Sequence, residues 1–250
     1  APDDIYLPEK KVALKKLFDV YLAHGGLPEY LRTENKEYLK ILYENILYLG
    51  ILVRYSLPNE KILKELVYFI ANNIGKEISF NAIKSLLGLG SPTTVKEYFH
   101  YFENSFLAFL INKFDYSLKK QIYTGKKVYL IDTGLAVNLG FRMSKDMGRL
   151  LENVVFIELK RRKKEIFYDR NKNECDFVIG SNRKIEEAVQ VCYEINEENK
   201  EREINGLVAT MKKLKLMRGS ILTHEQTEEY VVDGKKIHVL PVFKWLLNQA

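Results

Sequence analysis

The sequence predicts an α/β (α+β) protein with a helical N-terminal segment, a winged helix-turn-helix and a C-terminal mixed sheet flanked by helices. Apolar residues recur with a helical period near the N-terminus, and a strong helix-start signal lies in the middle of the chain. In the C-terminal half, apolar and polar residues alternate in several short runs, as they do in strands. The 250 residues suit one large domain or two to three small ones.

The first segment, residues 1–56, is predicted to be helical. Apolar residues follow a period near 3.6 over residues 10–26, and a second helical run covers residues 36–55. His24-Gly25-Gly26 should end the first helix, because glycine adopts the left-handed conformation at little cost. Pro58 marks the boundary to the next unit.

Residues 57–131 are predicted to form the winged helix-turn-helix. Ser91 is a helix cap and Pro92 occupies the first position of its third helix. Residues 108–132 are predicted to form two strands joined by a polar loop, which is typical of a wing. Such a motif places its third helix in the major groove and its wing along the DNA backbone. The candidate DNA contacts are therefore the lysines of these two elements: Lys96, Lys113, Lys119, Lys120, Lys126 and Lys127. Winged helices also dock proteins, so both kinds of partner stay open.

Residues 132–250 are predicted to alternate between helices and strands. Helices are expected over 145–164, 197–216 and 242–250, and strands over 165–170, 174–180, 186–195 and 219–224. Residues 228–241 are expected to form a short hairpin that turns at Asp233-Gly234. Asp176 and Gln190 are polar side chains inside apolar strand runs, and the alternation lets them converge in one hairpin. A buried carboxylate needs a partner, which is either a divalent cation or a hydrogen-bond donor from a neighbouring helix.

Five stretches resemble one known family. They are HGGLPEYL (24–31), KVYLIDTGL (127–135), GRLLENVVFIEL (148–159), FYDRNKNECDFVI (167–179) and AVQVC (188–192). Together they resemble the PD-(D/E)XK nuclease-like domain found at the C-terminus of many archaeal and bacterial AAA-type ATPases. The resemblance implies a restriction-endonuclease-like fold for residues 132–250. It also implies that residues 1–56 correspond to the end of an ATPase lid and that an ATPase module lies upstream.

The same resemblance implies a metal centre for phosphodiester cleavage, since Mg²⁺ or Mn²⁺ is held by oxygen ligands in such sites. Glu152 and Asp176 occupy the carboxylate positions, while Gln190 and Cys192 stand where an acid and a lysine are expected. We therefore expect four catalytic candidates: Glu152, Asp176, Gln190 and Cys192. The first three, with the backbone carbonyl of Val191, are the expected metal ligands. Arg170 matches the family's arginine and joins the candidate DNA contacts.

The departures from the family pattern leave two hypotheses open. Glutamine offers a carbonyl oxygen without negative charge, and a neutral cysteine cannot act as the missing cation. Glu187 could be an alternative ligand in a shifted register, and Lys184 could supply a cation from the turn. The chain is then either a metal-dependent DNA nuclease or a catalytically degenerate nuclease fold that binds DNA or docks proteins for an AAA-type ATPase.

Composition and short motifs narrow the classes of function that remain. A net charge of +6 permits binding to phosphate backbones. The pattern G-x-x-x-x-G-K-[ST] is absent, so this chain alone should not hydrolyse ATP. Two cysteines without a CxxC pair argue against a zinc site. With no apolar run of about 20 residues and no signal peptide, we expect a cytoplasmic protein without a membrane partner. Abundant Lys, Glu, Ile and Tyr lean toward a thermophile. DNA is the expected partner, with an upstream ATPase module or a second copy of the chain as further possibilities.

Overall fold

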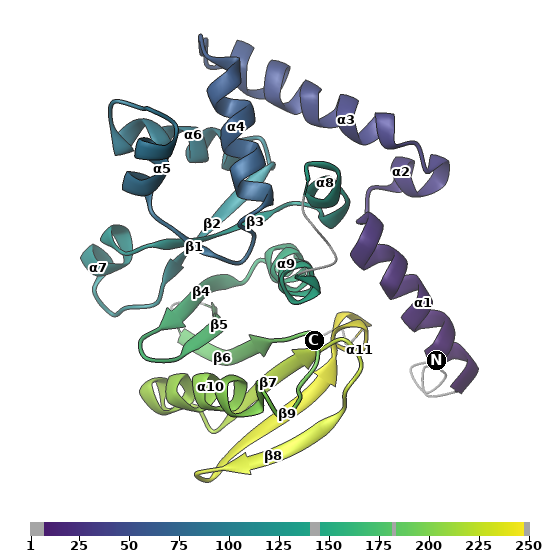
Figure 1. The fold of residues 1–250 in the computed structure, drawn as a ribbon. Coiled ribbons are helices and arrows are strands. Elements are labelled where there is room, and N and C mark those ends of the chain that lie inside the picture. Colours follow the sequence, from purple (N-terminus) through teal and green to yellow (C-terminus); the bar gives the residue numbers. More distant parts are fainter. Residues whose placement is uncertain (1–7, 141–145, 182–183, 248–250) are drawn as a thin grey trace.

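The computed structural model describes residues 8–140, 146–181 and 184–247. Residues 1–7 of the expected helical segment, residue 145 of the expected helix 145–164 and residues 248–250 of the expected terminal helix lie outside them. The described chain is a mixed α/β protein. Its nine strands form one sheet in the order β1-β3-β2-β4-β5-β6-β7-β9-β8 (Figure 1).

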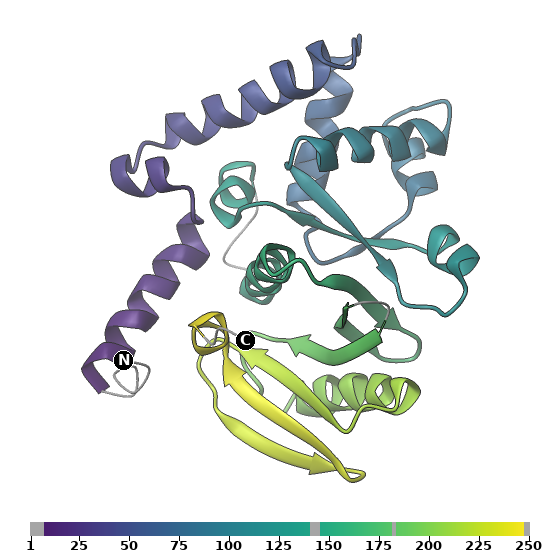
Figure 2. The ribbon, with the colours of Figure 1, turned by 180° about the vertical axis from the view of Figure 1, so that it is seen from behind.

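The N-terminal part is helical, as predicted. It consists of α1 (Pro8–His24), α2 (Pro28–Thr33), α3 (Lys36–Asn45) and a π-helix, η2 (Ile46–Val53). The Asn35 side chain caps α3 by accepting a hydrogen bond from the Glu37 amide. Figures 1 and 2 show α1, α2 and α3 along the outside of the molecule, away from the sheet. We call residues 8–53 the helical arm.

The arm is tied to the body where α1 ends. The Gly26 amide donates to one Asp132 carboxylate oxygen at 2.7 Å, and the Leu135 amide donates to the other at 3.0 Å. Gly25 has φ +77°, and a Cβ there would lie 2.1 Å from the Asp132 carboxylate. Position 25 thus requires glycine for two reasons: its backbone is left-handed, and the Asp132 carboxylate leaves no room for a side chain. The stretches HGGLPEYL and KVYLIDTGL, which lie about a hundred residues apart in the sequence, therefore contact each other in the fold.

The middle of the chain contains α4 (Glu60–Ala71), β1 (Glu77–Ile78), α5 (Phe80–Leu86), α6 (Pro92–Asn104), β2 (Ala108–Lys113), α7 (Leu118–Tyr123) and β3 (Lys126–Leu130). Ser91 caps α6 and Pro92 follows it, as predicted. Strand β3 pairs antiparallel with both β1 and β2. The polar loop predicted between β2 and β3 is wrong in part, since it contains the helix α7, which buries none of its residues.

The expectation that Lys126 and Lys127 are exposed on a wing is also wrong. All five residues of β3 are buried, because the strand lies between β1 and β2 and packs against α4 and α9. The Lys126 ammonium donates to the carbonyls of Gln121 and Ile122 at the end of α7. Lys127 contacts carboxylates that are described below. Neither ammonium is available to a DNA phosphate in this arrangement.

The C-terminal part contains α9 (Met147–Arg161), β4 (Glu165–Arg170), β5 (Glu174–Ser181), β6 (Lys184–Val191), α10 (Lys200–Leu214), β7 (Arg218–Thr223), β8 (Glu228–Val232), β9 (Lys235–Pro241) and α11 (Val242–Leu247). Strand β4 pairs in parallel with β2, so the sheet continues across residue 131. Strand β6 ends at Val191, which leaves Cys192 just outside the strand that the sequence predicts over 186–195.

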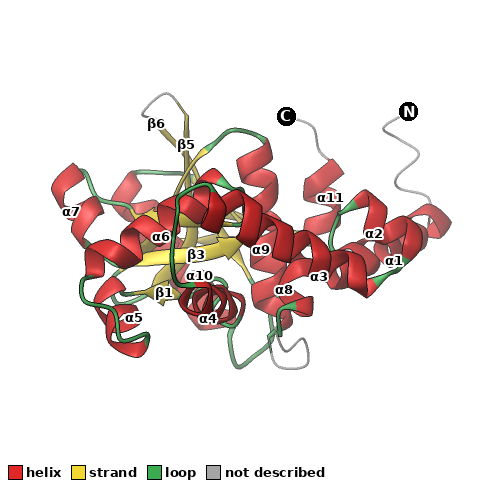
Figure 3. Ribbon diagram, turned by 90° about the horizontal axis from the view of Figure 1, so that it is seen from above, coloured by secondary structure: helices red, strands yellow, loops and turns green. Residues whose placement is uncertain are grey.

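Two apolar clusters cover the sheet at β5 and β6. Phe177, Val189 and Val191 belong to the cluster that contains the buried side of α9. Ala188 and Cys192 belong to the cluster that contains α10. The alternation predicted for β6 is therefore confirmed, because neighbouring residues pack against different helices. Figure 3 shows the helices gathered around the strands, with α7 and α1 at opposite ends of the molecule.

Candidate functional site: an acidic cavity at the ends of β5 and β6

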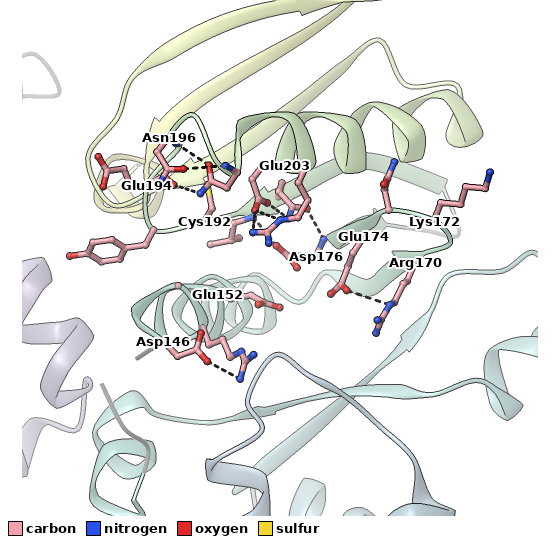
Figure 4. A pocket seen from close by; sticks show the side chains of 18 residues that line it. Asp146, Glu152, Arg170, Lys172, Glu174, Asp176, Cys192, Glu194, Asn196 and Glu203 are labelled. Carbon is pink, nitrogen blue, oxygen red and sulfur yellow. Dashed lines mark hydrogen bonds and ion pairs between the residues drawn. The ribbon is translucent and has the colours of Figure 1, made fainter. Parts of the chain in front are cut away.

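A cavity of about 740 Å³ lies between the start of α9, the turn from β4 to β5, the end of β6 and the start of α10 (Figure 4). Its walls carry both acids and bases. The lining includes Arg170 and all five residues of the predicted centre, which are Glu152, Asp176, Gln190, Val191 and Cys192. These residues lie on three separate stretches of the sequence. The other charged lining residues are Asp146, Arg149, Lys172, Glu174, Glu194, Arg202 and Glu203. The structure thus brings the predicted centre together around one opening.

Behind the cavity wall, Lys127 joins three carboxylates. Its ammonium lies 2.9 Å from Glu152, 2.8 Å from Asp176 and 2.7 Å from Glu174. The lysine is 1% exposed and does not line the cavity. Burial lowers the pKa of Lys127, but the charges of Asp176 and Glu152 outweigh it and raise that pKa well above its ordinary value. Lys127 is therefore a charged, buried counterion of the two predicted metal-binding carboxylates.

Glu152 carries the clearest electrostatic signature. Burial, followed by the charge of Asp176, raises its pKa from 4.5 to about 7, although Lys127 opposes this shift. The Tyr129 hydroxyl donates to the same Glu152 oxygen as Lys127, at 2.6 Å. Burial, reinforced by Glu152, raises the pKa of Tyr129 well above its ordinary value, so it stays a donor. Burial first, and the neighbouring Asp176 charge second, favour the neutral carboxyl, so Glu152 takes up its proton at a much higher pH than an exposed glutamate.

Gln190 connects the cavity to α10. Its side-chain oxygen accepts from the Asp176 amide at 3.2 Å, and its nitrogen donates to Glu203 at 2.7 Å. Arg202 neutralises the other Glu203 oxygen. Figure 4 shows Glu203 pointing from α10 and Glu152 from α9, on opposite sides of Asp176. The convergence of Asp176 and Gln190 that the sequence predicts is present, but it occurs through the backbone amide of Asp176.

Cys192 does not replace the missing lysine. It is buried against α10, and its pKa is raised to about 12 by burial and by the charge of Glu203. Its backbone amide donates to the Leu222 carbonyl. The thiol is thus neutral at ordinary pH and supplies no positive charge.

The side-chain oxygens that were predicted as metal ligands do not fit a Mg²⁺ or Mn²⁺ ion in their present arrangement. One Asp176 oxygen accepts from Lys127, and the other accepts from the Val191 amide at 2.9 Å. The Gln190 oxygen is also engaged. Within the part of the chain that the structure describes, no three His, Cys, Asp or Glu side chains are grouped to hold a metal ion. Mg²⁺ needs near-octahedral oxygen ligands at about 2.1 Å, and this arrangement would have to be rebuilt to supply them.

The remaining predicted residues lie outside this cluster. Lys96 is exposed on α6, Lys119 and Lys120 are exposed on α7, and Lys113 is half-buried at the end of β2. Arg170 lies at the cavity edge, 3.3 Å from Glu77 and 3.6 Å from Glu174. The Glu187 carboxylate accepts from the Ser220 hydroxyl, and neither Glu187 nor Lys184 lines the cavity.

Sequence reasoning missed the role of Lys127 and Tyr129. Both lie on β3, two residues apart, and so they face the same side of the strand. That alternation of polar side chains inside KKVYL was the available signal. Their partners lie 23 to 49 residues further along the chain, on α9 and β5. Glu203, at the start of α10, was missed as well.

The fold and the cavity define a mixed α/β protein with a buried carboxylate pair that an internal lysine neutralises. Residues 15–146, more than half of the chain, match the family model described as Domain of unknown function (DUF8612), and the protein belongs to that family. That match ends just before α9 and includes Lys127.

Two relatives match nearly all of the chain. An uncharacterized protein of Methanocaldococcus jannaschii is 38% identical over 97% of this chain, and an uncharacterized protein of Haemophilus influenzae is 30% identical over 93% of it. The chain spans 58% of the length of each. No solved structure matches the sequence. No helix within the described residues has the length and apolar character to cross a membrane.

Proposed function

We propose that the chain is a DNA-binding protein with a catalytically degenerate, nuclease-like C-terminal part. One observation carries the proposal: residues 116–123, which are α7 and the two residues before it, expose lysines and aromatic rings side by side in the sequence. Tyr116 and Tyr123 are each 80% exposed, and the exposed Lys119 and Lys120 lie between them in the sequence. Aromatic rings stack on bases and lysines neutralise phosphates, so such a mixture suits a nucleic acid. We call residues 116–123 the α7 surface.

The arrangement around the α7 surface supports the proposal. Three helices, α4, α5 and α6, precede the β2–β3 hairpin, and β1 joins that hairpin, as the winged helix interpretation requires. A groove of about 1090 Å³ runs between α6 and α7, with Lys96 and His100 on one side and Tyr123 on the other. Because the α7 surface carries two exposed lysines and two exposed tyrosines against the single Lys96 of α6, we assign it the larger share of the binding energy.

The proposal that the nuclease-like part is catalytically degenerate rests on the residues of the predicted metal centre. Gln190 uses its oxygen within the protein, Cys192 is a neutral thiol, and the buried Lys127 does not reach the cavity. Because position 192 holds a neutral thiol, the centre lacks the lysine that would orient a water molecule or stabilise charge on a phosphate there. The mixed sheet flanked by α9 and α10 agrees with the restriction-endonuclease-like fold that the resemblance implies. We also propose an AAA-type ATPase module as the functional partner, because HGGLPEYL and KVYLIDTGL resemble that family.

Salt-dependent binding of duplex and single-stranded DNA in the presence of EDTA tests the proposal. Changing Lys119 and Lys120 to alanine together should weaken binding and reduce the slope of log K against log salt by about 2, since each phosphate contact contributes about 0.9. Changing Lys36 and Lys40 to alanine is the matched control. It removes the same charge from α3, on the far side of the molecule (Figure 1). Equal losses in both variants would remove the α7 surface from the interface.

A second candidate, a Mg²⁺- or Mn²⁺-dependent DNA nuclease, is favoured by the charge of the cavity. Glu152 and Asp176 line an opening that also carries Arg149, Arg170 and Lys172, which could receive a phosphate. Incubation of supercoiled, linear, single-stranded and branched DNA with either metal tests this function. Cutting that EDTA and Asp176→Ala both abolish would establish it and would overturn the degenerate assignment.

A further inference from the structure

The cavity has a permanent cation of its own behind its wall. An ammonium group has three N–H donors, and Lys127 has three carboxylate partners at 2.7 to 2.9 Å, from α9 and β5. Two of these partners, Glu152 and Asp176, are themselves buried. The lysine therefore donates hydrogen bonds to both acids that the sequence predicts as metal ligands, and Glu174 is its third ion-pair partner.

The position of Lys127 is fixed by the sheet rather than by the cavity. Its neighbour Lys126 pairs with Ile78 of β1 and Asn112 of β2, and Lys127 itself pairs with Glu77 and Ile111. Pairing on both sides fixes the backbone of Lys127 within the sheet. Its ammonium is held beside Glu152 and Asp176 because the side chain is buried and its ion-pair partners are the carboxylates.

We infer that Lys127 is the resident cation of this centre: its ammonium, supplied by β3, holds Glu152 and Asp176 together in place of a divalent metal and keeps such a metal out. A metal bound to both carboxylates would lie close to this ammonium, which already occupies one oxygen of each, while the second Asp176 oxygen accepts from the Val191 amide. The repulsion between the ammonium and a divalent cation at such short range opposes that binding. Lys127 is thus a positioning residue, and the carboxylates become a cation site only when its charge is removed.

Lys127→Met tests the inference, because methionine keeps the length of the side chain and removes the charge. Lys126→Met is the matched control, since Lys126 is a buried lysine on the same strand whose partners are carbonyls. Melting temperatures are measured with EDTA and with millimolar Mn²⁺. Without metal, Lys127→Met should melt roughly 10 °C lower than the parent, as expected when a buried ion pair loses one partner. Mn²⁺ should then raise the melting temperature of Lys127→Met and leave the parent and Lys126→Met unchanged.

Two results would overturn the inference. One is a parent protein that Mn²⁺ stabilises as much as it stabilises Lys127→Met, because the metal would then bind with the lysine in place. The other is a Lys127→Met protein that keeps the parent's melting temperature. If Lys127→Met does not fold, the triple variant with Glu152→Gln and Asp176→Asn removes the carboxylate charges as well. Folding of the triple variant supports the counterion role, and its failure to fold overturns it. No DNA is present, so the outcome is distinguishable from failure of the proposed DNA binding.

Discussion

Glu152 should make the stability of the protein depend on pH. Its pKa is raised from 4.5 to about 7 in the folded protein, because the carboxyl is buried beside Asp176. Between these two values the unfolded chain releases the proton and the folded protein keeps it. The contribution of Glu152 to the free energy of unfolding is therefore full below pH 4.5 and is lost as the pH rises through about 7. At about 1.4 kcal/mol for each pH unit, the loss is about 3 kcal/mol.

Urea denaturation between about pH 4 and 8 measures this contribution when the parent is compared with Glu152→Gln. Glutamine keeps the shape and an acceptor oxygen for Lys127 and Tyr129, but it does not titrate. The difference in unfolding free energy between the two proteins should change by about 3 kcal/mol across the range, with the parent losing stability toward high pH. Parallel curves would refute the reasoning.

Glu158→Gln on the same helix is the matched control. Glu158 is also buried, but its hydrogen bonds to Arg161 and Arg162 overcome the effect of burial and lower its pKa. Its contribution to stability is present above its ordinary pKa and is lost as the pH falls, which is the opposite sign. A control that behaves like Glu152→Gln would show that the effect belongs to the helix in general.

Two further changes test the contacts around the site and the arm. Gln190→Glu replaces the amide that donates to Glu203 with a second carboxylate, and should cost about 1–3 kcal/mol in chemical denaturation at neutral pH; a neutral or stabilising result would contradict the bridging role. Asp132→Ala removes the acceptor of the Gly26 and Leu135 amides and should loosen the arm, seen as faster proteolytic cleavage near residues 25–35 at a stability cost of about 2–3 kcal/mol. Cleavage at the parent's rate would show that other contacts hold the arm.

Local sequence signals predicted much of the fold. The end of α1 at His24, the cap at Ser91 and the alternation along β6 depend on signals of a few residues, and the structure has them as expected. The helix α7 was missed because six residues without a side-chain cap or a buried face carry no periodic signal. The pairing of β2 with β4, which makes one sheet of two predicted units, is a contact between distant residues that no local pattern encodes.

The candidate site could be predicted only in part, for the same reason. A pattern on α9, β5 and β6 identified Glu152, Asp176 and Gln190, and these residues do line one cavity. The lysine that neutralises them comes from β3, which is adjacent to α9 only in the folded protein. The sequence assigned Lys127 to DNA because it falls in the predicted wing, where a lysine is expected to be exposed. Three carboxylate partners make its burial possible.

The most direct measurement of the central claim follows retention and integrity of the same labelled DNA, with Mn²⁺ and with EDTA. A DNA-binding protein with a lysine-neutralised, degenerate centre should retain the DNA equally in both conditions, lose affinity as salt is raised, and leave every strand intact. Strand cutting that requires Mn²⁺, or retention that disappears in EDTA, would contradict it, since either result would place a working metal at Glu152 and Asp176.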